Sequence, residues 1–243
     1  MKAMITGNNG AVAPYVNREL KSRNIDVTVW NRELIGIDNE EEVYRFIEET
    51  KPDIFFHIAT GPIEWLEYIA KATKKLGIKL VFTSTVSVFS EDKTGPYTPE
   101  SIPDAENSYG VYKIQCEKLL KEVYPEAYIL RLGWQIGSET GSNNMFDFLC
   151  RGQRDNGCIE ASSQWYPSCS FLEDTAAAIV GIALNYESNT YLLNSNRNYS
   201  FYDIVNYLKR LHQQDWKVVE TNALVRDDRM YDDRVPMKPF DFS

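Results

Sequence analysis

The residues of this chain best suited to acid–base chemistry are Tyr109 and Lys113, which lie within the stretch 108–113 (SYGVYK). Because they are four positions apart, the two side chains share one face of a helix. A phenol ordinarily loses its proton near pH 10, and a fixed ammonium group beside it favours the phenolate and lowers its pKa. The pair could therefore hand a proton to a carbonyl oxygen. The same spacing is frequent on solvated helices, so its meaning depends on what the chain places around it.

A glycine turn near the start of the chain predicts a phosphate-binding site. Residues 2–6 are expected to form a short apolar strand, residues 7–13 (GNNGAVA) a turn, and the following residues a helix to about position 23. Gly7 would allow a tight turn, Gly10 would let the backbone approach a pyrophosphate, and the small Ala13 would let the helix pack on the strand. The N–H groups at the helix start would then face the phosphates. An ordinary Gly/Asn turn is the other interpretation, but the position at the start of an alternating strand–helix chain favours a nucleotide.

The residues after the second expected strand, 26–30, bear on the choice of cofactor. An NAD-selective site usually has a carboxylate here for the ribose 2′-OH, whereas this chain has Asn31 and Arg32. An Arg suits a 2′-phosphate, and Asn31 lacks the repelling charge, so the pattern favours NADPH over NADH. The other interpretation is that Arg32 is a solvated loop residue. Residues 35–38 are expected to form a short third strand that places Asp38 near the adenine.

Strands and helices continue to alternate, which predicts a doubly wound parallel sheet of the α/β class. The apolar runs 54–59 and 79–83 are typical of parallel strands covered on both faces. Helices are expected at 39–50, 62–76, around Tyr109, at 141–151, at 171–184 and after the capping residue Ser200, strands at 127–132 and 190–193, and loops at 91–107 and 164–167. Asn39 is expected to cap its helix. The later part of the chain is expected to form a small lobe over the strand ends.

Two further residues lie where strands are expected to end. Thr85 follows the fifth expected strand, and a hydroxyl at the carboxyl end of a central strand lies on the ligand-binding edge of an open α/β sheet. Thr85 could hydrogen-bond a substrate oxygen, or it could simply cap the strand end. Trp134 follows the strand at 127–132 and could pack on a sugar or a base, with a core tryptophan as the other interpretation.

Composition excludes several classes of function. The net charge of −9 argues against nucleic-acid binding, which needs a basic surface, but it allows an anionic small ligand. No apolar run is long enough to cross a membrane, and the first residues do not resemble a signal peptide, so we expect a cytoplasmic protein. The two histidines and the four scattered cysteines show no metal-ligand spacing, so no metal site is predicted.

The order of several motifs carries a resemblance to a known family. Besides the glycine turn, the motifs are residues 84–89 (STVSVF), Tyr109-Gly110-x-x-Lys113 followed by Glu117, Arg131-x-x-Trp134, residues 141–144 (GSNN) and residues 164–167 (QWYP). Together they resemble the extended short-chain dehydrogenase/reductase superfamily and, within it, the dTDP-4-dehydrorhamnose reductase family. The resemblance extends over about residues 2–211, and it lies in the order of the motifs more than in any one of them.

The resemblance implies one Rossmann-type unit over residues 1–243 that reduces a keto sugar with NADPH. Residues 1–135 would mainly bind NAD(P), and about 136–243 would mainly form a small α/β substrate lobe, with some segments returning to the Rossmann part. The substrate would be a 4-keto nucleotide sugar, and the protein a monomer or homodimer. Tyr109 would donate the proton, Lys113 would lower the Tyr109 pKa and bind the nicotinamide ribose, and Thr85 would orient the carbonyl.

The resemblance and the pattern together define a set of expected contacts. The cofactor would meet Thr6, Gly7, Asn9, Gly10, Ala11, Val12, Asn31, Arg32, Ile37, Asp38, Ala59, Thr60 and Lys113. The substrate would meet Ser87, Trp134, Asn144 and Gln164.

The sequence also departs from the family's pattern. Val86 and Ser87 replace an Asp-Tyr pair that lines the family's sugar pocket, and the stretch after Ala59 is shorter than in the family. The C-terminal arginine-rich segment is matched only loosely, through Arg226, Arg229 and Arg234. Two other functions therefore stay open: an NAD-dependent nucleotide-sugar epimerase or dehydratase, and an NADP-binding regulatory subunit without catalysis.

Overall fold

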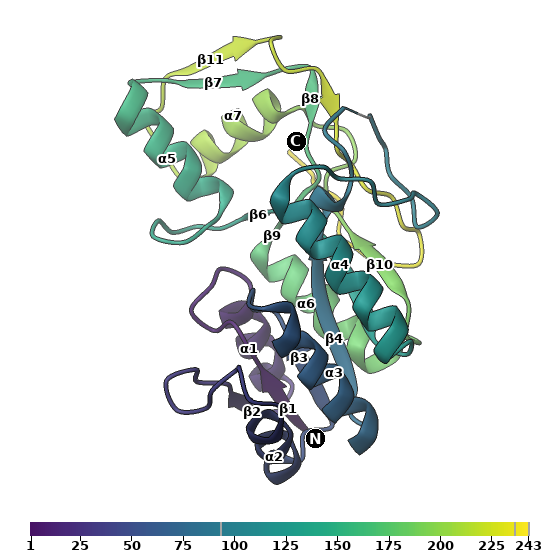
Figure 1. Cartoon of the computed structure of the whole chain (residues 1–243). Helices are drawn as coiled ribbons and strands as arrows, with labels where there is room; N and C mark the ends of the chain where they lie inside the picture. The colour runs from purple at the N-terminus through teal and green to yellow at the C-terminus, as the bar shows by residue number, and fades with distance from the viewer. Residues whose placement is uncertain (93, 236, 243) are drawn as a thin grey trace.

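The computed structural model describes residues 1–92, 94–235 and 237–242, and a parallel β-sheet forms its centre (Figure 1). Six strands lie in the order β10-β5-β4-β3-β1-β2, and every neighbouring pair is parallel. The chain adds β2 on one side of β1 and then β3, β4 and β5 on the other, which confirms the predicted doubly wound sheet. The strands are β1 (Lys2–Ile5), β2 (Asp26–Val29), β3 (Ile54–His57), β4 (Lys79–Thr85), β5 (Tyr128–Leu132) and β10 (Thr190–Leu193).

Helices cover both faces of this sheet. On β3, Phe56 packs into the layer of apolar side chains shared with α1 and α6, and Phe55 into the layer shared with α2, α3 and α4. Successive strand residues point to opposite faces, so a strand between two helix layers is apolar throughout, as the run at 54–59 indicated. The helices are α1 (Ala13–Ser22), α2 (Glu40–Thr50), α3 (Ile63–Leu76), α4 (Ser108–Val123) and α6 (Leu172–Asn185).

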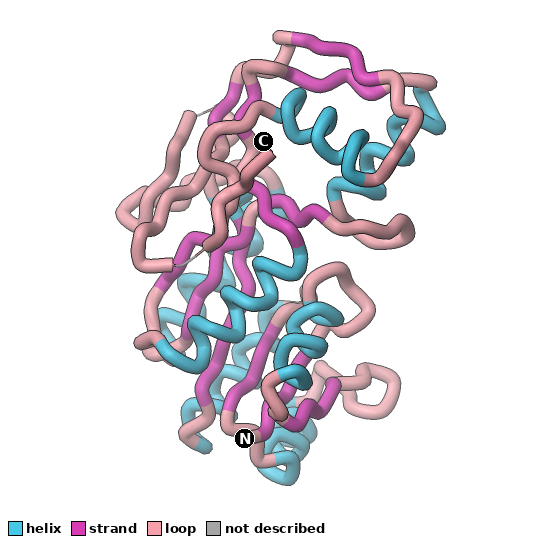
Figure 2. Tube along the Cα trace, turned by 180° about the vertical axis from the view of Figure 1, so that it is seen from behind, coloured by secondary structure: helices cyan, strands magenta, loops and turns pink. Residues whose placement is uncertain are grey.

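The later part of the chain builds a lobe above the carboxyl ends of the strands, seen at the top of Figure 1 and from behind in Figure 2. Three two-stranded sheets pair β6 with β9, β7 with β11 and β8 with β12, around an apolar cluster of their own. From the same part of the chain, α6 and β10 return to the main sheet. The lobe elements are β6 (Trp134–Ile136), α5 (Met145–Asn156), β7 (Ile159–Ser162), β8 (Trp165–Tyr166), β9 (Cys169–Phe171), α7 (Phe201–Leu211), β11 (Val218–Thr221) and β12 (Arg226–Asp227).

Side-chain caps determine where several helices begin. Asn39 and Ser200, both predicted N-caps, accept hydrogen bonds from backbone N–H groups in the first turns of α2 and α7. Asn107 caps α4 in the same way, because its Oδ1 accepts a hydrogen bond of 2.8 Å from the Gly110 N–H. A cap of this kind contributes about 1 kcal/mol. The cap on α4 also orients the helical turn on which Tyr109 lies.

Two segments differ from what the sequence predicted. Residues 35–38 form turns instead of a strand, because the Ile35 N–H donates to the Asn31 carbonyl and the Trp30 indole donates to the Ile35 carbonyl. The segment is held by these local bonds and pairs with no strand. The predicted loop at 164–167 contains β8, which pairs with β12. A strand of two residues has no periodic signal, and its partner lies far along the chain.

A buried ion pair ties α4 to the sheet. Glu117 Oε1 accepts hydrogen bonds from Ser84 Oγ (2.6 Å) and Arg131 Nε (3.0 Å), and Glu117 Oε2 accepts one from Arg131 Nη2 (2.8 Å). The Arg131 and Glu117 side chains are each 3% exposed, so each charge depends on the other. Ser84 belongs to β4 and Arg131 to β5. The network therefore positions the helix that carries Tyr109 and Lys113.

Replacing Glu117 with alanine should lower the free energy of unfolding by about 3–5 kcal/mol, because it leaves the Arg131 charge buried without a partner. Urea unfolding measures this change. The matched control is Glu67→Ala, which breaks the exposed 2.8 Å ion pair with Lys71. That variant should differ from the unmodified protein by less than about 1 kcal/mol. Equal losses in the two variants would contradict the role given to the buried pair.

Candidate active site

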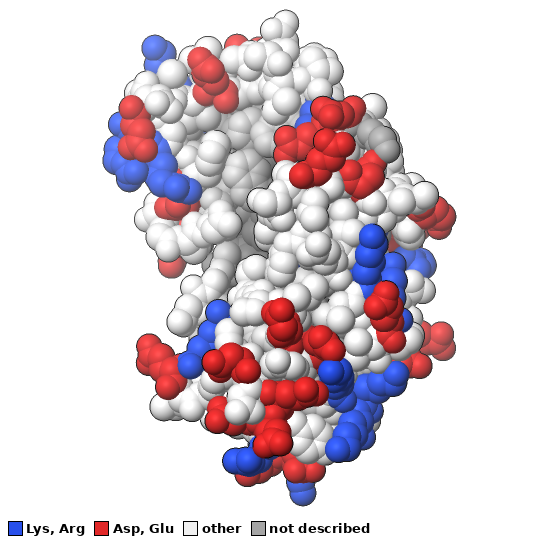
Figure 3. Space-filling view, viewed as in Figure 1, with Lys and Arg blue, Asp and Glu red and all other residues white. Residues whose placement is uncertain are grey.

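A cavity of about 1000 Å³ opens between the main sheet and the lobe, at the carboxyl ends of the central strands. Figure 3 shows the groove between these two parts of the molecule. Open α/β sheets bind ligands at this edge, where the strand order reverses. The predicted site residues in the wall are Gly7, Asn9, Gly10, Ala11, Val12, Asn31, Arg32, Ala59, Thr60, Thr85, Ser87, Tyr109, Lys113 and Trp134. Wall residues that were not predicted include Asn8, Glu33, Gln135 and Asn143.

The turn after β1 has the geometry that a dinucleotide pyrophosphate requires. Gly7 has a φ of +82°, and a Cβ atom there would lie 2.9 Å from the backbone nitrogen of Ala59. Any other residue at this position would be strained and would collide with the chain after β3. Because α1 begins at Ala13, residues 7–12 line the cavity just before a helix N-terminus, an arrangement that favours bound phosphate. The residues present fit an NAD(P) pyrophosphate.

Thr6, a predicted cofactor contact, lies behind the cavity wall instead. The residue is 1% exposed, and its Oγ1 accepts hydrogen bonds of 3.1 Å from the N–H groups of Ile58 and Ala59. Thr6 Oγ1 also lies 3.2 Å from Nδ1 of His57. Burial lowers the pKa of His57 to about 3, so this ring is neutral at physiological pH. Thr6 therefore joins the ends of β1 and β3 and supports the wall from within.

Asn31 and Arg32 line the cavity beyond β2. The Arg32 guanidinium lies over the Trp65 ring, 4.5 Å from its centre, and Nη2 donates a hydrogen bond to the Thr60 carbonyl. The Arg32 side chain is thus held at the cavity edge by these two contacts. A solvated loop residue would not be held in this way. The guanidinium has five N–H donors, so several remain for an anionic ligand.

The residues expected beside the adenine are placed differently. Ile37 and Asp38 are not part of the cavity wall, because their segment folds into turns and not into the expected third strand. Glu33 takes a place in the wall next to Arg32. The sequence pattern contained no signal for Glu33, because its position follows from the shape of the turn after Asn31.

Thr85, Ser87 and Tyr109 meet in another part of the cavity. Thr85 ends β4, and its Oγ1 accepts a hydrogen bond of 3.1 Å from the Ser87 N–H and lies 3.2 Å from Ser87 Oγ. Tyr109, in the first turn of α4, is 47% exposed and hydrogen-bonds with Thr85. The end of a strand and the start of a helix therefore bring a hydroxyl and a phenol together.

Lys113 does not act on Tyr109 as the spacing predicted. Burial raises the pKa of Tyr109, and the hydrogen bond with Thr85 is what opposes this rise. Lys113 Nζ donates instead to the Thr83 carbonyl at 2.8 Å, and it lies 6.0 Å from the centre of the Tyr109 ring. Burial also lowers the pKa of Lys113 to about 8. Sharing one helix face is therefore not enough, because the lysine side chain turns toward the sheet.

Gly110 allows the start of α4 to approach the turn after β4. A Cβ atom on Gly110 would lie 2.2 Å from the Ser87 carbonyl oxygen and 2.4 Å from the Ala105 Cβ. Any side chain at Gly110 would push Tyr109 away from Thr85. The next aromatic residue, Tyr112, is absent from the wall and donates a hydrogen bond of 2.8 Å to the Gly61 carbonyl. Tyr112 therefore projects from another part of the helix than Tyr109.

On the lobe side, Trp134 lines the cavity, but Asn144 and Gln164 do not. Asn144 is 2% exposed and caps α5, where its Oδ1 accepts a hydrogen bond from the Asp147 N–H. Its amide also donates to the Glu139 carbonyl, so the side chain organises the loop before α5. The neighbouring Asn143 takes the place in the wall that was predicted for Asn144.

Gln135 is a cavity residue that no motif indicated. The residue is 7% exposed, its Nε2 donates a hydrogen bond of 2.9 Å to the Gly133 carbonyl, and its Oε1 has no hydrogen-bond partner among the described residues. Alternation along β6 gives no signal for it, because Trp134, which lies on the opposite face of the strand, lines the same cavity.

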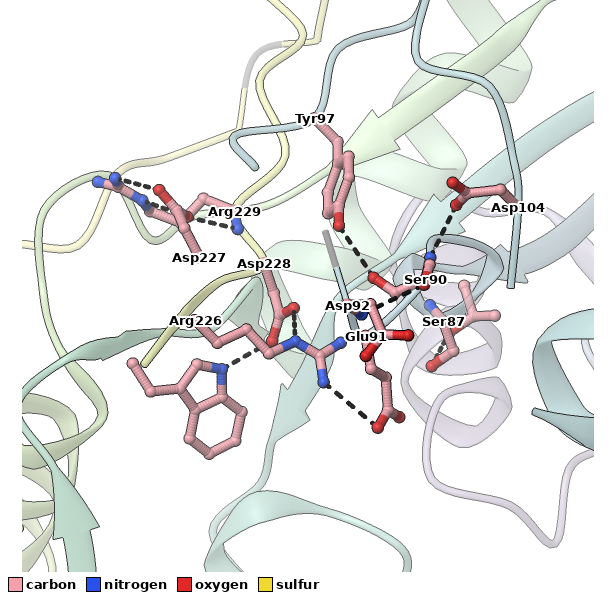
Figure 4. Close-up of polar contacts among 12 residues, drawn as sticks. Ser87, Ser90, Glu91, Asp92, Tyr97, Asp104, Arg226, Asp227, Asp228 and Arg229 are labelled. Atoms are coloured by element: carbon pink, nitrogen blue, oxygen red, sulfur yellow. Dashed lines mark hydrogen bonds and ion pairs between the residues drawn. The ribbon is translucent and has the colours of Figure 1, made fainter. Parts of the chain in front are cut away.

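The arginines of the C-terminal segment are paired internally and are absent from the cavity wall. Each forms an ion pair with an aspartate two positions away: Arg226 with Asp228, Arg229 with Asp227, and Arg234 with Asp232. Figure 4 shows the first two pairs and the contact of Arg226 with Glu91 (3.8 Å) in the loop after the 3₁₀ turn η1 (Val86–Val88). These contacts join the tail to that loop.

Among the residues that the structure describes, no group of three or more His, Cys, Asp or Glu side chains is placed to hold a metal ion. Within the same residues, no helix has the length and apolar character needed to span a membrane.

A family model matches more than half of the chain, and two named proteins are similar to it in sequence. The family model described as "RmlD substrate binding domain" matches residues 64–221. The spore coat polysaccharide biosynthesis protein SpsK of Bacillus subtilis is 22% identical over 195 residues, which are 74% of this chain and 68% of that protein. The dTDP-4-dehydrorhamnose reductase of Mycobacterium tuberculosis is 27% identical over 132 residues, 51% of this chain. That match spans 41% of the reductase, less than half of its length.

Solved structures share the fold at low sequence identity. The dTDP-4-dehydrorhamnose reductase of Bacillus anthracis, determined in complex with NADP, is 21% identical and has a TM-score of 0.80. The similarity covers 95% of this chain and 90% of that one. At this level of identity the likeness establishes the fold, and it confirms the predicted Rossmann-like architecture.

The buried ammonium of Lys113 should make stability depend on pH. An unfolded lysine titrates near 10.4, so between about pH 8 and 10.4 the unfolded chain binds a proton that the native protein does not. Stability therefore rises with pH in this window. Relative to a Lys113→Met variant, the free energy of unfolding should increase by about 3 kcal/mol between pH 7 and pH 10.5.

Urea unfolding of both proteins at the two pH values measures the difference. Lys74→Met is the control, because Lys74 also donates to a backbone carbonyl, that of Val123, but is exposed. It should show the same pH dependence as the unmodified protein. If the free energy of unfolding changed with pH by the same amount in the Lys113→Met variant and in the unmodified protein, the lowered pKa of Lys113 would be refuted.

Proposed function

Since this chain belongs to the RmlD substrate binding domain family, we propose that it is an oxidoreductase that uses NADPH to reduce a keto group on a nucleotide sugar. One observation carries the proposal: residues 7–12 and the group Thr85, Tyr109 and Lys113 line the same cavity. A dinucleotide cradle and a proton donor thus share one site. The names of the relatives support the nucleotide-sugar class, and the motifs that resemble the reductase family support a 4-keto sugar as substrate.

Different side chains have different roles around the carbonyl group. When bound, NADPH supplies the hydride that the carbonyl carbon accepts. Tyr109 holds the proton that neutralises the alkoxide formed on the carbonyl oxygen. Thr85 orients this oxygen by a hydrogen bond and stabilises its developing charge. The hydrogen bond between Thr85 and Tyr109 lowers the pKa of the phenol and so opposes the larger effect of burial.

Lys113 contributes mainly by binding the nicotinamide ribose, and less by lowering the pKa of Tyr109. Its ammonium has three N–H donors, and the Thr83 carbonyl uses one of them. Two remain for the hydroxyl groups of the nicotinamide ribose, as the family resemblance implies. Because Nζ is fixed by the sheet, the ribose would be held at a defined height above β4.

The way in which the short stretch after β3 is held favours an active enzyme over a protein without catalysis. The Thr60 carbonyl accepts a hydrogen bond from Arg32, and the Gly61 carbonyl accepts one from Tyr112. The stretch is thus held from both sides and forms a defined part of the wall. Its reduced length removes no member of the group Thr85, Tyr109 and Lys113, which favours the reductase over a regulatory subunit.

Replacing Tyr109 with phenylalanine should lower turnover by about 10²–10⁴-fold, because the variant has no proton to donate. The melting temperature should stay unchanged, since Tyr109 is half exposed. The assay follows NADPH oxidation over a panel of 4-keto nucleotide sugars. Tyr44→Phe is the matched control, because Tyr44 lies on α2, outside the cavity, where its hydroxyl donates to the exposed Glu48, and this variant should retain activity.

Two other results of this assay would contradict the proposal. Tightly bound NAD⁺ in the purified protein, together with no net oxidation of NADPH, would favour an epimerase or dehydratase. Binding of NADPH without reduction of any ketone in the panel, together with a stable complex with another protein in pull-downs, would favour a regulatory subunit.

Replacing Arg32 with alanine should weaken binding of NADPH by roughly 10- to 100-fold, because hydrogen bonds between charged groups contribute about 1.5–3 kcal/mol. The affinity for NADH, which has no 2′-phosphate, should change little. Titration of both cofactors by calorimetry measures the two effects, with Arg18→Ala as a control on the exposed side of α1. Equal affinities of the unmodified protein for NADPH and NADH would refute the role of Arg32.

A further inference from the structure

Phe148 on α5 exposes a large aromatic surface beside the cavity. The residue is 49% exposed, whereas Met145, Phe146 and Leu149 of the same helix are buried in the lobe core. Its ring lies 5.2 Å from the ring of Trp134, at an interplanar angle of 73°. Because Trp134 lines the cavity, the Phe148 ring extends that aromatic wall outward.

Trp134 is held in place by further rings behind it. The Trp165 and Phe201 rings lie 6.1 Å and 6.0 Å from it, at interplanar angles of 24° and 21°. Trp165 and Phe201 also touch each other, with ring centres 4.7 Å apart. Trp165 is fixed in turn, because its Nε1 donates a hydrogen bond of 2.7 Å to Asp228. The aromatic wall is therefore rigid before a ligand arrives, which lowers the cost of binding.

Exposure alone does not distinguish Phe148, because single apolar side chains are common on protein surfaces. Ile102, Val225 and Leu34 are more exposed, at 81%, 76% and 78%. Phe148 differs from them because its ring contacts an aromatic residue of the cavity wall.

The charges around the cavity point to the kind of ligand that this surface would take. Among the described residues, Arg32 and Lys113 are the lysines and arginines of the wall, and both lie on the side of the main sheet. The C-terminal arginines are already paired with aspartates. On the lobe side, a nucleotide substrate would therefore be held by stacking more than by ion pairing.

The geometry points to a stacking platform for the planar base of the nucleotide-sugar substrate, in which the base stacks on the Phe148 ring and its edge meets the nearly perpendicular Trp134 ring; this inference rests on the proposed function. Each base has a π face, so stacking tolerates different bases and fits the lobe side of the cavity, where no lysine or arginine among the described residues lines the wall. The keto sugar would then lie toward Thr85 and Tyr109. Phe148 is thus a binding residue for the nucleotide part, and it takes no part in the transfer of hydride or proton.

The test titrates UDP, dTDP and GDP into the full-length protein saturated with NADP⁺, using calorimetry. Phe148→Ala should lower the affinity for the tightest-binding diphosphate by at least roughly fivefold. Phe148→Tyr should restore this affinity, because stacking needs a ring. Leu211→Ala is the matched control, since Leu211 has the same exposure of 49% but lies at the end of α7. NADPH affinity should be unchanged in all three variants.

In steady-state assays, Phe148→Ala should raise KM for the nucleotide sugar and leave kcat unchanged, as expected for lost ground-state binding. Unchanged affinity of Phe148→Ala for the diphosphates would overturn the platform while leaving the proposed reduction intact. Loss of affinity of the Phe148→Ala variant for glucose 1-phosphate would also overturn the platform. This ligand has no base, so the ring would then contact the sugar. If the unmodified protein bound none of the three diphosphates, the platform would also be refuted. In that case, reduction of a keto sugar that carries no nucleotide would show that the NADPH-dependent activity itself is intact.

Discussion

The buried contact between Glu117 and Arg131 is the interaction on which the rest of the site depends. It crosses from α4 to β5 and includes Ser84 of β4, so it joins the helix that carries Tyr109 and Lys113 to two strands of the sheet. Since a buried charge without a partner is costly, the helix cannot slide along the sheet without breaking a charged pair. The distance between Thr85 at the end of β4 and Tyr109 on α4 is thereby determined by an interaction in which neither residue takes part.

Close backbone approach is the second constraint, and it acts at two parts of the cavity. At Gly7, a side chain would collide with the chain after β3, and at Gly110 it would collide with the turn after β4. In both places the absence of a Cβ atom lets one backbone segment come close to the segment that follows a neighbouring strand. The first approach shapes the phosphate cradle, and the second brings the phenol to the threonine hydroxyl. The chemistry proposed here depends on both being present at one edge of the sheet.

The departures from the family's pattern have a common physical consequence. Ser87 replaces a larger side chain, the stretch after Ala59 is short but held by Arg32 and Tyr112, and the C-terminal arginines are paired with aspartates. The lobe side of the site therefore has little positive charge and a wall of aromatic rings. Under the proposed function, recognition of the substrate would depend on shape and stacking, while Thr85, Tyr109 and Lys113 line the cavity around the carbonyl group.

The sequence by itself determined the doubly wound sheet, the glycine turn, the helix caps at Asn39 and Ser200, and the group Thr85, Tyr109 and Lys113. These features follow from local spacing and from apolar periodicity, which the chain shows directly. It could not determine that Lys113 turns toward Thr83, that Asn143 and not Asn144 reaches the cavity, that residues 35–38 form turns, or that β8 pairs with β12. Residues 35–38 are held by local hydrogen bonds with Trp30 and Asn31, and each of the other features depends on which distant backbone group or side chain lies within reach. Only the tertiary structure decides that, because the competing local conformations differ by no more than one or two hydrogen bonds.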